Sequence, residues 1–403
     1  NNKKLIFKDA TYEEEIRTVR LYPNSGNPND KFLPAVEPLG EGRLFLEFDD
    51  LVEAHEEYRV KIIHCNADWT KSKLRNLDYL NDFNEFNINQ FTYSVDTKIG
   101  YVHYEFRLPR VKLPGNYLLV AYRGSDEKDI ILSKRFMVYQ PNVNVRISSN
   151  LNGLTSIRRT NQQIDFDVIY DDFELMDPMQ TVKVVIRQNQ RWDNIITIDK
   201  PNFIRELENR LEYRFFDFSN NFSAANEYRF FDLRSLRYPG QQVYKVDISK
   251  RPISAFIMAD QPRIYQAYSQ YNDLNGNFII QNSDMGGGDA SSDYLFVNFT
   301  LDTKEKLAGD IYVVGQMNNY DRDKSSKLTY NEQAKVYQGE LLLKQGWYDY
   351  QYHIEADTLN YNYLEGNHFE TENEYEILVY YRPMNLRSDV LIGYNQFRIN
   401  RRN

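Results

Sequence analysis

The chain has 403 residues, which at about 150 residues per domain predicts two to three domains. Lysine and arginine number 49 against 58 aspartate and glutamate, so the formal net charge is −9. This acidic balance argues against nucleic acid as the main partner, because phosphate binding needs a basic surface. A hydrophobic content of 41% excludes a disordered chain. No apolar run approaches the roughly 18 residues that a membrane helix requires, so we expect no membrane-spanning segment.

The single cysteine, Cys65, excludes an intrachain disulfide, a cysteine-rich zinc module and a CxxC redox centre. It ends a strand-like run at 58–65, and we therefore expect a free, buried, structural thiol. The sequence starts at Asn1 rather than at Met, and we expect that a signal peptide has been removed.

Alternation of apolar and polar residues dominates the chain and predicts half-buried strands. The clearest predicted strands are residues 43–48, 58–65, 101–108, 181–188 and 294–301. One stretch with apolar residues at a spacing of three, residues 74–86, predicts a helical segment, but its Asn and Asp residues weaken that prediction. The pattern indicates an all-β fold of tandem β-sandwich domains with long polar loops.

Three tyrosines follow a turn and open a strand: Tyr117, Tyr228 and Tyr348. Their intervals match the usual size of a sandwich domain, about 100 residues. We interpret them as tyrosine corners, in which the hydroxyl bonds to backbone across the turn. Chance is the alternative in a chain with 32 tyrosines.

These patterns predict four segments. Residues 1–141 form an N-terminal sandwich domain, 142–259 a second sandwich, 260–293 a connecting segment and 294–403 a C-terminal sandwich. Within the connecting segment, residues 283–292 are rich in glycine and serine and have almost no apolar anchor. We expect this loop to be mobile.

No catalytic constellation stands out. Adjacent strand residues point to opposite faces, so His64 and Cys65 cannot act as a pair. Asp49–Asp50 and Asp171–Asp172 could be paired carboxylates for glycoside chemistry, but solvated aspartates beside turns are the favoured interpretation. Residues 318–323 could ligate calcium, but no bidentate Glu follows at EF-hand spacing, and a β-turn is the favoured explanation. We expect no enzyme activity, no catalytic residue, no cofactor and no metal site.

Residues 312–320 run from a strand through a glycine turn to an aromatic residue. They resemble the early-set sandwich modules that bind starch and glycogen. Gly315 and Asn318–Asn319 match the turn of that family, and Tyr320 stands where the family usually has Trp. This resemblance implies an early-set-like C-terminal domain and leaves a carbohydrate-binding envelope protein as the alternative function.

A more specific resemblance lies in the N-terminal domain. The stretches that carry it are 19–23, 64–69, 72–86, 101–104 and 113–117, and two later ones are 272–276 and 373–381. They resemble the plug proteins of the type IX secretion system of Gram-negative bacteria, whose C-terminal part is Ig-like or early-set-like.

That family implies a non-enzymatic periplasmic protein attached to the outer membrane through its partner. The partner is a very large outer-membrane β-barrel translocon, together with other translocon-associated subunits. The plug docks on the periplasmic side and seals the pore when no client is present. The resemblance assigns no binding residues.

Overall fold

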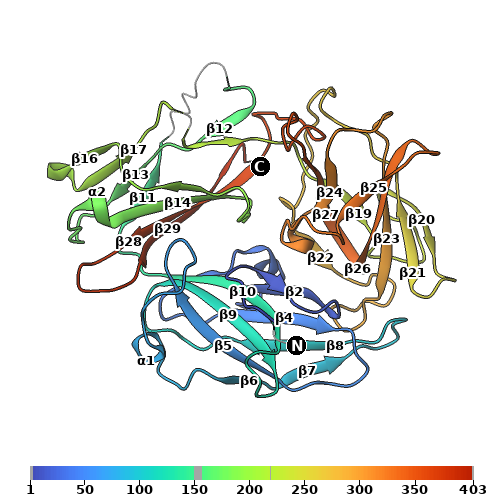
Figure 1. The fold of residues 1–403 in the computed structure, drawn as a ribbon, viewed down its shortest axis with the longest axis horizontal. Helices are drawn as coiled ribbons and strands as arrows, with labels where there is room; N and C mark the ends of the chain where they lie inside the picture. The colour runs from blue at the N-terminus through green and yellow to red at the C-terminus, as the bar shows by residue number, and fades with distance from the viewer. Residues whose placement is uncertain (1–2, 149–156, 218, 402–403) are drawn as a thin grey trace.

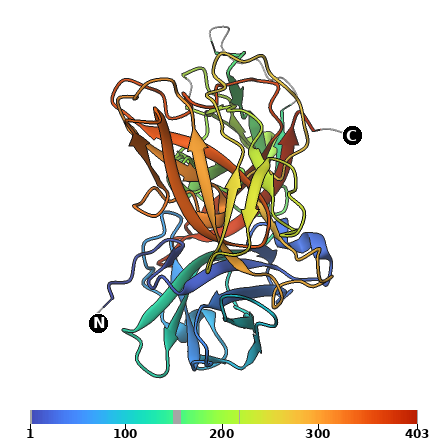
Figure 2. The ribbon, with the colours of Figure 1, turned by 90° about the vertical axis from the view of Figure 1, so that its right-hand side faces the viewer.

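The computed structural model describes residues 3–148, 157–217 and 219–401. Three β-rich domains make up the molecule, and the first lies beneath the other two in both views (Figures 1 and 2). Among the described residues the α-helices are short, α1 (Asn76–Tyr79) and α2 (Pro178–Thr181), and 3-10 turns occur at η1 (Pro28–Phe32), η2 (Glu206–Glu208) and η3 (Gln316–Asn318). The predicted all-β class is confirmed. The predicted helical segment at 74–86 shrinks to the single turn of α1.

The first domain is a sandwich of two sheets around one apolar core. One sheet has the order β1 (Ala10–Thr11), β10 (Ile130–Tyr139), β9 (Gly115–Arg123), β5 (Tyr58–Cys65) and β6 (Phe86–Ile88), with β3 (Val36–Pro38) parallel to β10. The other has the order β2 (Ile16–Pro23), β4 (Leu44–Asp50), β8 (Val102–Arg107) and β7 (Gln90–Tyr93). Leu44, Leu46 and Phe48 alternate into the core, as predicted.

The second domain joins strands that are far apart in the sequence. One sheet has the order β11 (Asn144–Ile147), β13 (Phe166–Ile169), β17 (Arg210–Tyr213) and β16 (Phe203–Arg205). The other has the order β15 (Ile196–Ile198), β14 (Val182–Gln188), β28 (Asn373–Tyr381) and β29 (Val390–Ile399). A ribbon of β12 (Asn161–Gln163) and β18 (Asn221–Ser223) adjoins them. Figure 1 shows red β28 beside green β14.

The third domain is one nine-stranded sheet that curls around its own core. Its order is β19 (Arg229–Asp232), β27 (Gly346–Glu355), β24 (Asp310–Val314), β25 (Lys327–Asn331), β26 (Val336–Lys344), β23 (Tyr294–Leu301), β21 (Ile253–Ile257) and β20 (Val243–Asp247), with β22 (Phe278–Ile280) on β27.

The domain boundaries that follow from strand pairing differ from those of the predicted domains 142–259 and 294–403. Strands β19 to β21 pair into the third domain, whereas β28 and β29 return to the second. The third domain is therefore inserted into the second, and the predicted connecting segment 260–293 supplies strand β22. Period-two alternation marks a strand but carries no information about its partner, which explains the difference.

Two of the three predicted tyrosine corners are present. The Tyr117 hydroxyl donates to the Leu113 carbonyl at 2.7 Å, and the Tyr348 hydroxyl donates to the Lys344 carbonyl at 2.6 Å. The prediction for Tyr228 is wrong. Its hydroxyl bonds to that of Tyr320 at 2.9 Å, because it precedes the edge strand β19 instead of crossing a sandwich turn.

Candidate functional site: the junction of the three domains

The stretches that carry the plug-family resemblance lie together in the structure. His64 on β5 pairs with Tyr117 on β9, and their rings meet edge to face at 5.0 Å. Gly115 lies against the same imidazole, where a Cβ atom would be 2.5 Å from Nε2 of His64. Residues 64–69 and 113–117 therefore form one packed unit.

This packed unit contacts the second domain. The Asn116 side chain accepts a hydrogen bond from the Tyr380 hydroxyl at 2.8 Å, and the Ala67 amide donates to Asp389 at 2.9 Å. An apolar cluster extends across the same boundary, from Leu118 and Val120 to its second-domain members. A buried apolar contact of this kind disfavours hinge motion between domains.

Two tryptophans and two arginines extend the contact between the first and second domains. Trp69 meets Trp192 edge to face at 5.0 Å. The guanidinium groups of Arg135 and Arg187 lie 4.6 and 4.4 Å from the Trp192 ring. Arg187 also forms a buried bidentate pair with Glu376, with both N–O distances 2.7 Å. Such planar pairs fix orientation as well as supplying energy.

A buried carboxylate, Asp49, links the first domain to the third. The Lys344 ammonium and the Tyr294 hydroxyl both lie 2.6 Å from Oδ2 of Asp49, and Nδ1 of His103 lies 2.7 Å from Oδ1. The Lys344 ammonium also lies 4.3 Å from the centre of the Tyr101 ring.

Burial sets the electrostatics of this link. It lowers the pKa of Lys344, although the neighbouring Asp49 partly offsets the effect. Burial opposes the charge of His103 as well, but the hydrogen bond to Asp49 and the negative charge of that carboxylate together outweigh burial and raise the pKa of the imidazole. Removing one member of such a group leaves an unpaired buried charge.

The interpretation of Asp49–Asp50 as solvated turn residues is wrong. Both are buried, Asp49 at 0% and Asp50 at 1% exposure. They point to opposite sides of β4, and Asp50 accepts a hydrogen bond from the Tyr58 hydroxyl at 2.6 Å. They are therefore two separate structural carboxylates and not a catalytic pair. Asp171 and Asp172 are exposed in a turn, as expected.

The Gly/Ser-rich loop at 283–292 contacts the first domain. The Tyr101 hydroxyl donates to the carbonyls of Asp289 and Ser292 at 2.6 and 2.8 Å, and the Val95 amide donates to Ala290 at 2.9 Å. The Asp289 carboxylate lies 2.8 Å from the Lys31 ammonium. These polar contacts need no apolar anchor, so composition alone does not reveal them.

Glu47, His103 and Asp289 bring ligand atoms close enough to be compared with a metal site. Lys31 already contacts both carboxylates, at 3.1 and 2.8 Å. Positive side chains thus neutralise the acidic groups, and the arrangement is explained without a cation. Asp323, from the possible calcium loop, accepts hydrogen bonds from Ser325 in an ordinary turn.

Tyr320 is not presented for stacking on a sugar. Its ring is 2% exposed and packs at the contact between the second and third domains, with the Arg191 guanidinium 4.4 Å from its centre. Asn318 bonds to the backbone of Gly315 and Val313, which fixes the turn. Carbohydrate binding thereby loses the residue on which that alternative rested.

Sequence reasoning missed the groups that join the domains, above all Asp49, Lys344 and Trp192. Asp49 and Lys344 are 295 positions apart, and no local pattern marks either as buried. The local features that could have drawn attention to these residues are the position of Lys344 at the end of an apolar strand and that of Trp192, a tryptophan in a polar loop.

Residues 16–140 match the family model described as "Type 9 secretion system plug protein 1st domain". The crystal structure of a hypothetical protein from Parabacteroides merdae ATCC 43184 is similar over 98% of this chain and 100% of that chain, with 32% sequence identity and a TM-score of 0.91. No curated protein matches the chain. The chain therefore belongs to one family with the Parabacteroides merdae protein, and its residues 16–140 form a type 9 secretion system plug protein first domain.

Proposed function

We propose that the chain is a non-enzymatic plug that docks on the periplasmic side of the type IX secretion translocon, an outer-membrane β-barrel, and seals its pore when no client is present. The observation that carries this proposal is the match of residues 16–140 to the first domain of plug proteins. The plug would be periplasmic and attached to the outer membrane through the translocon.

The build of the molecule supports a steric task. Buried contacts join the first domain to both others, so the three domains form one obstruction without needing a cofactor. Among the described residues no helix has the length and hydropathy to cross a membrane. A plug must also leave when cargo enters, which favours a polar-rimmed, moderate interface over an obligate apolar one.

Copurification tests the docking step. The full chain carrying an affinity tag should recover a barrel of very high mass from detergent extracts of the outer membrane, and the untagged chain serves as the control. Recovery of no barrel from a strain that expresses the translocon would contradict docking.

Permeability tests the sealing step. Deleting the gene should leave secretion largely intact and make the outer membrane leaky to compounds that it normally excludes, and the full chain supplied in trans should restore the barrier. A deletion strain with an unchanged barrier would contradict sealing.

A further inference from the structure

Three loops meet at the end of the second domain that points away from the third domain. They are residues 170–181 between β13 and β14, residues 206–209 between β16 and β17, and residues 382–389 between β28 and β29. The Tyr170 amide donates to the Asn209 carbonyl at 2.9 Å, and the Arg382 amide donates to the Thr181 carbonyl at 2.9 Å, so the loops are neighbours. Figure 1 shows α2 and the β28–β29 hairpin at the left of the molecule and the third domain at the right. We call these three loops the free end.

The free end exposes apolar side chains. Four of them are exposed, and they include three of the seven methionines of the chain: Met176, Met179, Leu207 and Met384. Partly buried Phe173 and Leu386 connect this surface to the core of the second domain. Methionine adapts its shape to a partner, and apolar side chains gathered on one surface mark an interaction site.

The charge of the free end is negative and uncompensated. Among the described residues, four exposed carboxylates of the loop 170–181 enter no ion pair and no side-chain hydrogen bond: Asp171, Asp172, Glu174 and Asp177. Arg382 is paired with Asp389, with Nε 2.7 Å from Oδ1, so Arg387 is the remaining cation of the hairpin.

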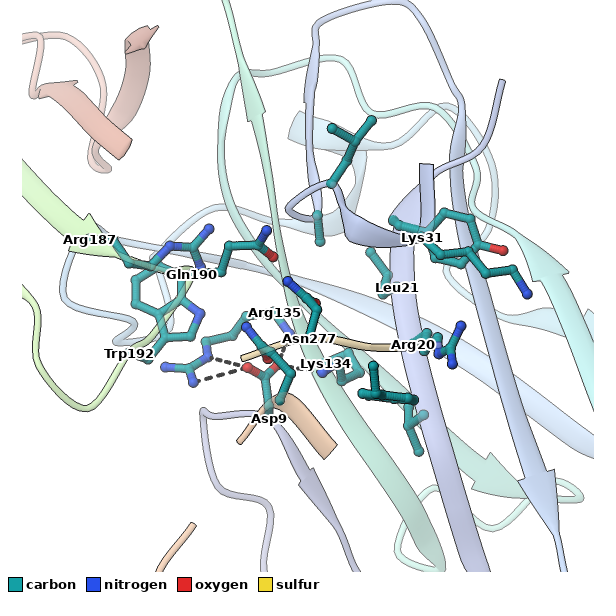
Figure 3. Close-up of a pocket in the computed structure, with 16 residues that line it drawn as sticks. Asp9, Arg20, Leu21, Lys31, Lys134, Arg135, Arg187, Gln190, Trp192 and Asn277 are labelled. Atoms are coloured by element: carbon teal, nitrogen blue, oxygen red, sulfur yellow. Dashed lines mark hydrogen bonds and ion pairs between the residues drawn. The ribbon is translucent and has the colours of Figure 1, made fainter. Parts of the chain in front are cut away.

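The charged groups at the junction of the three domains differ from those at the free end. Figure 3 shows Asp9 bonded to Arg135, with a shortest ion-pair distance of 3.1 Å, and Arg187 lies 2.7 Å from Glu376. Charges at the junction therefore neutralise one another, whereas the carboxylates of the free end remain available to a partner.

A cavity of about 460 Å³ lies beside these carboxylates. Asp171 and Asp172 line it together with Val143, Ile169 and Phe173. Both aspartates are exposed, so the cavity is open to solvent. This lining suits the side chain of a lysine or an arginine, whose methylene groups pack on apolar neighbours while its charged head reaches a carboxylate.

Charge selects among the possible occupants of the free end. A second copy that met the first at the same end would bring like charges together, which is unfavourable across an interface. A lipid surface is disfavoured because anionic headgroups attract basic surfaces and not acidic ones. A segment that carries both basic and apolar side chains complements the carboxylates and the methionines at once.

We propose that the free end is a docking surface for a basic amphipathic segment of another protein. A lysine or arginine of that segment occupies the cavity at Asp171 and Asp172, and its apolar side chains cover the exposed methionines. The inference rests on the exposure and charge of this end and does not depend on the plug function.

Calorimetric titration of the full chain with synthetic peptides tests the chemistry of the partner. A peptide of alternating lysine and leucine should bind saturably. A peptide of alternating lysine and serine has the same charge but no apolar side chains, so it should bind about tenfold more weakly. A peptide of alternating glutamate and leucine should not bind.

A pair of charge variants locates the site of the lysine–leucine peptide. Asp171→Asn combined with Asp172→Asn should weaken its binding about tenfold, because the basic side chain loses its acceptors. The matched control is Glu340→Gln combined with Asp357→Asn, which removes two exposed carboxylates of the third domain. This control should bind the peptide like the wild type.

A pair of methionine variants tests the apolar part of the surface. Met176→Ser combined with Met384→Ser should also weaken binding about tenfold. Met258→Ser combined with Met285→Ser alters two equally exposed methionines of the third domain, at 50% and 52% exposure, and should leave binding unchanged. All four side chains are exposed, so the variants are expected to fold.

The remaining occupants are separated by sedimentation. Vesicles of phosphatidylethanolamine and phosphatidylglycerol should leave the chain in solution. Cosedimentation with vesicles that the Met176 and Met384 variant abolishes would identify a lipid site, and self-association that it abolishes would identify a second copy. Either result overturns the proposal, as does failure of the lysine–leucine peptide to bind or unchanged binding in the Asp171 and Asp172 variant.

Discussion

Burial controls the reactivity of Cys65 at the residue scale. The side chain is 0% exposed, and burial raises the pKa of its thiol to about 12. Because the thiolate is the reactive form, we predict negligible labelling of the native protein by a thiol reagent near pH 8 and complete labelling in denaturant. Fast stoichiometric labelling of the folded chain would contradict this expectation.

His64 should make the stability of the molecule depend on pH. Burial lowers its pKa to about 4, whereas the unfolded value is about 6.5. The unfolded state therefore binds more protons between these values, and stability is complete above about pH 6.5 and declines toward pH 4. His64 alone should reduce the free energy of unfolding by about 2 kcal/mol between pH 7.5 and pH 5.

Urea unfolding at these two pH values measures the effect, with His64→Leu as the comparison. The variant should lose less stability on acidification than the wild type, whatever its stability at pH 7.5. Equal losses in both proteins would show that His64 is not the group responsible.

At the scale of single elements, the hydrogen bonds of the two tyrosine corners should contribute to the stability of the fold. Each hydroxyl closes a turn by donating a hydrogen bond to a backbone carbonyl. Tyr117 donates to Leu113, and Tyr348 donates to Lys344. Tyr117→Phe and Tyr348→Phe should each reduce the free energy of unfolding by about 1–2 kcal/mol. Tyr238→Phe, at a side chain that is 76% exposed, should change it little. Chemical denaturation compares the three, and equal values for all would contradict a role for the corner bonds.

Individual strands could be predicted from the sequence, and their partners could not. Strand β5 coincides with the predicted 58–65, and β23 with the predicted 294–301, because alternation directly reflects one buried face. The pairing of β14 with β28 depends on contacts across about half of the chain. Local periodicity contains no signal for such pairing, and the insertion of the third domain into the second was therefore not foreseen.

The same limit applies to the candidate site. The burial of Cys65 could be predicted from its place in a strand. The burial of Asp49 depends on its contacts with Lys344 and His103, which lie on other strands. From the sequence alone, a charged residue is expected to be solvent-exposed unless its partner is known. The hypothesis that Tyr320 presents its ring to a sugar is wrong for the same reason, because Arg191 of the second domain covers that ring.

At the scale of the whole molecule, buried links between domains should make unfolding cooperative. The apolar cluster couples the first domain to the second, and the pair of Asp49 and Lys344 couples the first to the third. Opening either boundary would expose apolar surface or separate paired charges, so the domains are expected to lose structure together. A single calorimetric transition is the expected result for the wild type.

Lys344→Met tests this coupling most directly. The ammonium and its partner Asp49 are both 1% exposed in their side chains. Removing the ammonium leaves the buried carboxylate with its hydrogen bonds to Tyr294 and His103 but without its lysine, and breaking a buried ion pair typically costs about 3–5 kcal/mol. The variant should unfold at lower temperature, with the third domain separating first. Asp49→Asn in the same chain should recover part of the loss, because no buried charge is then left alone. Lys306→Met removes a lysine of the same domain from an exposed pair with Glu332 and should cost less than about 1 kcal/mol. If calorimetry finds the two single variants equally stable, the buried pair does not hold the first and third domains together.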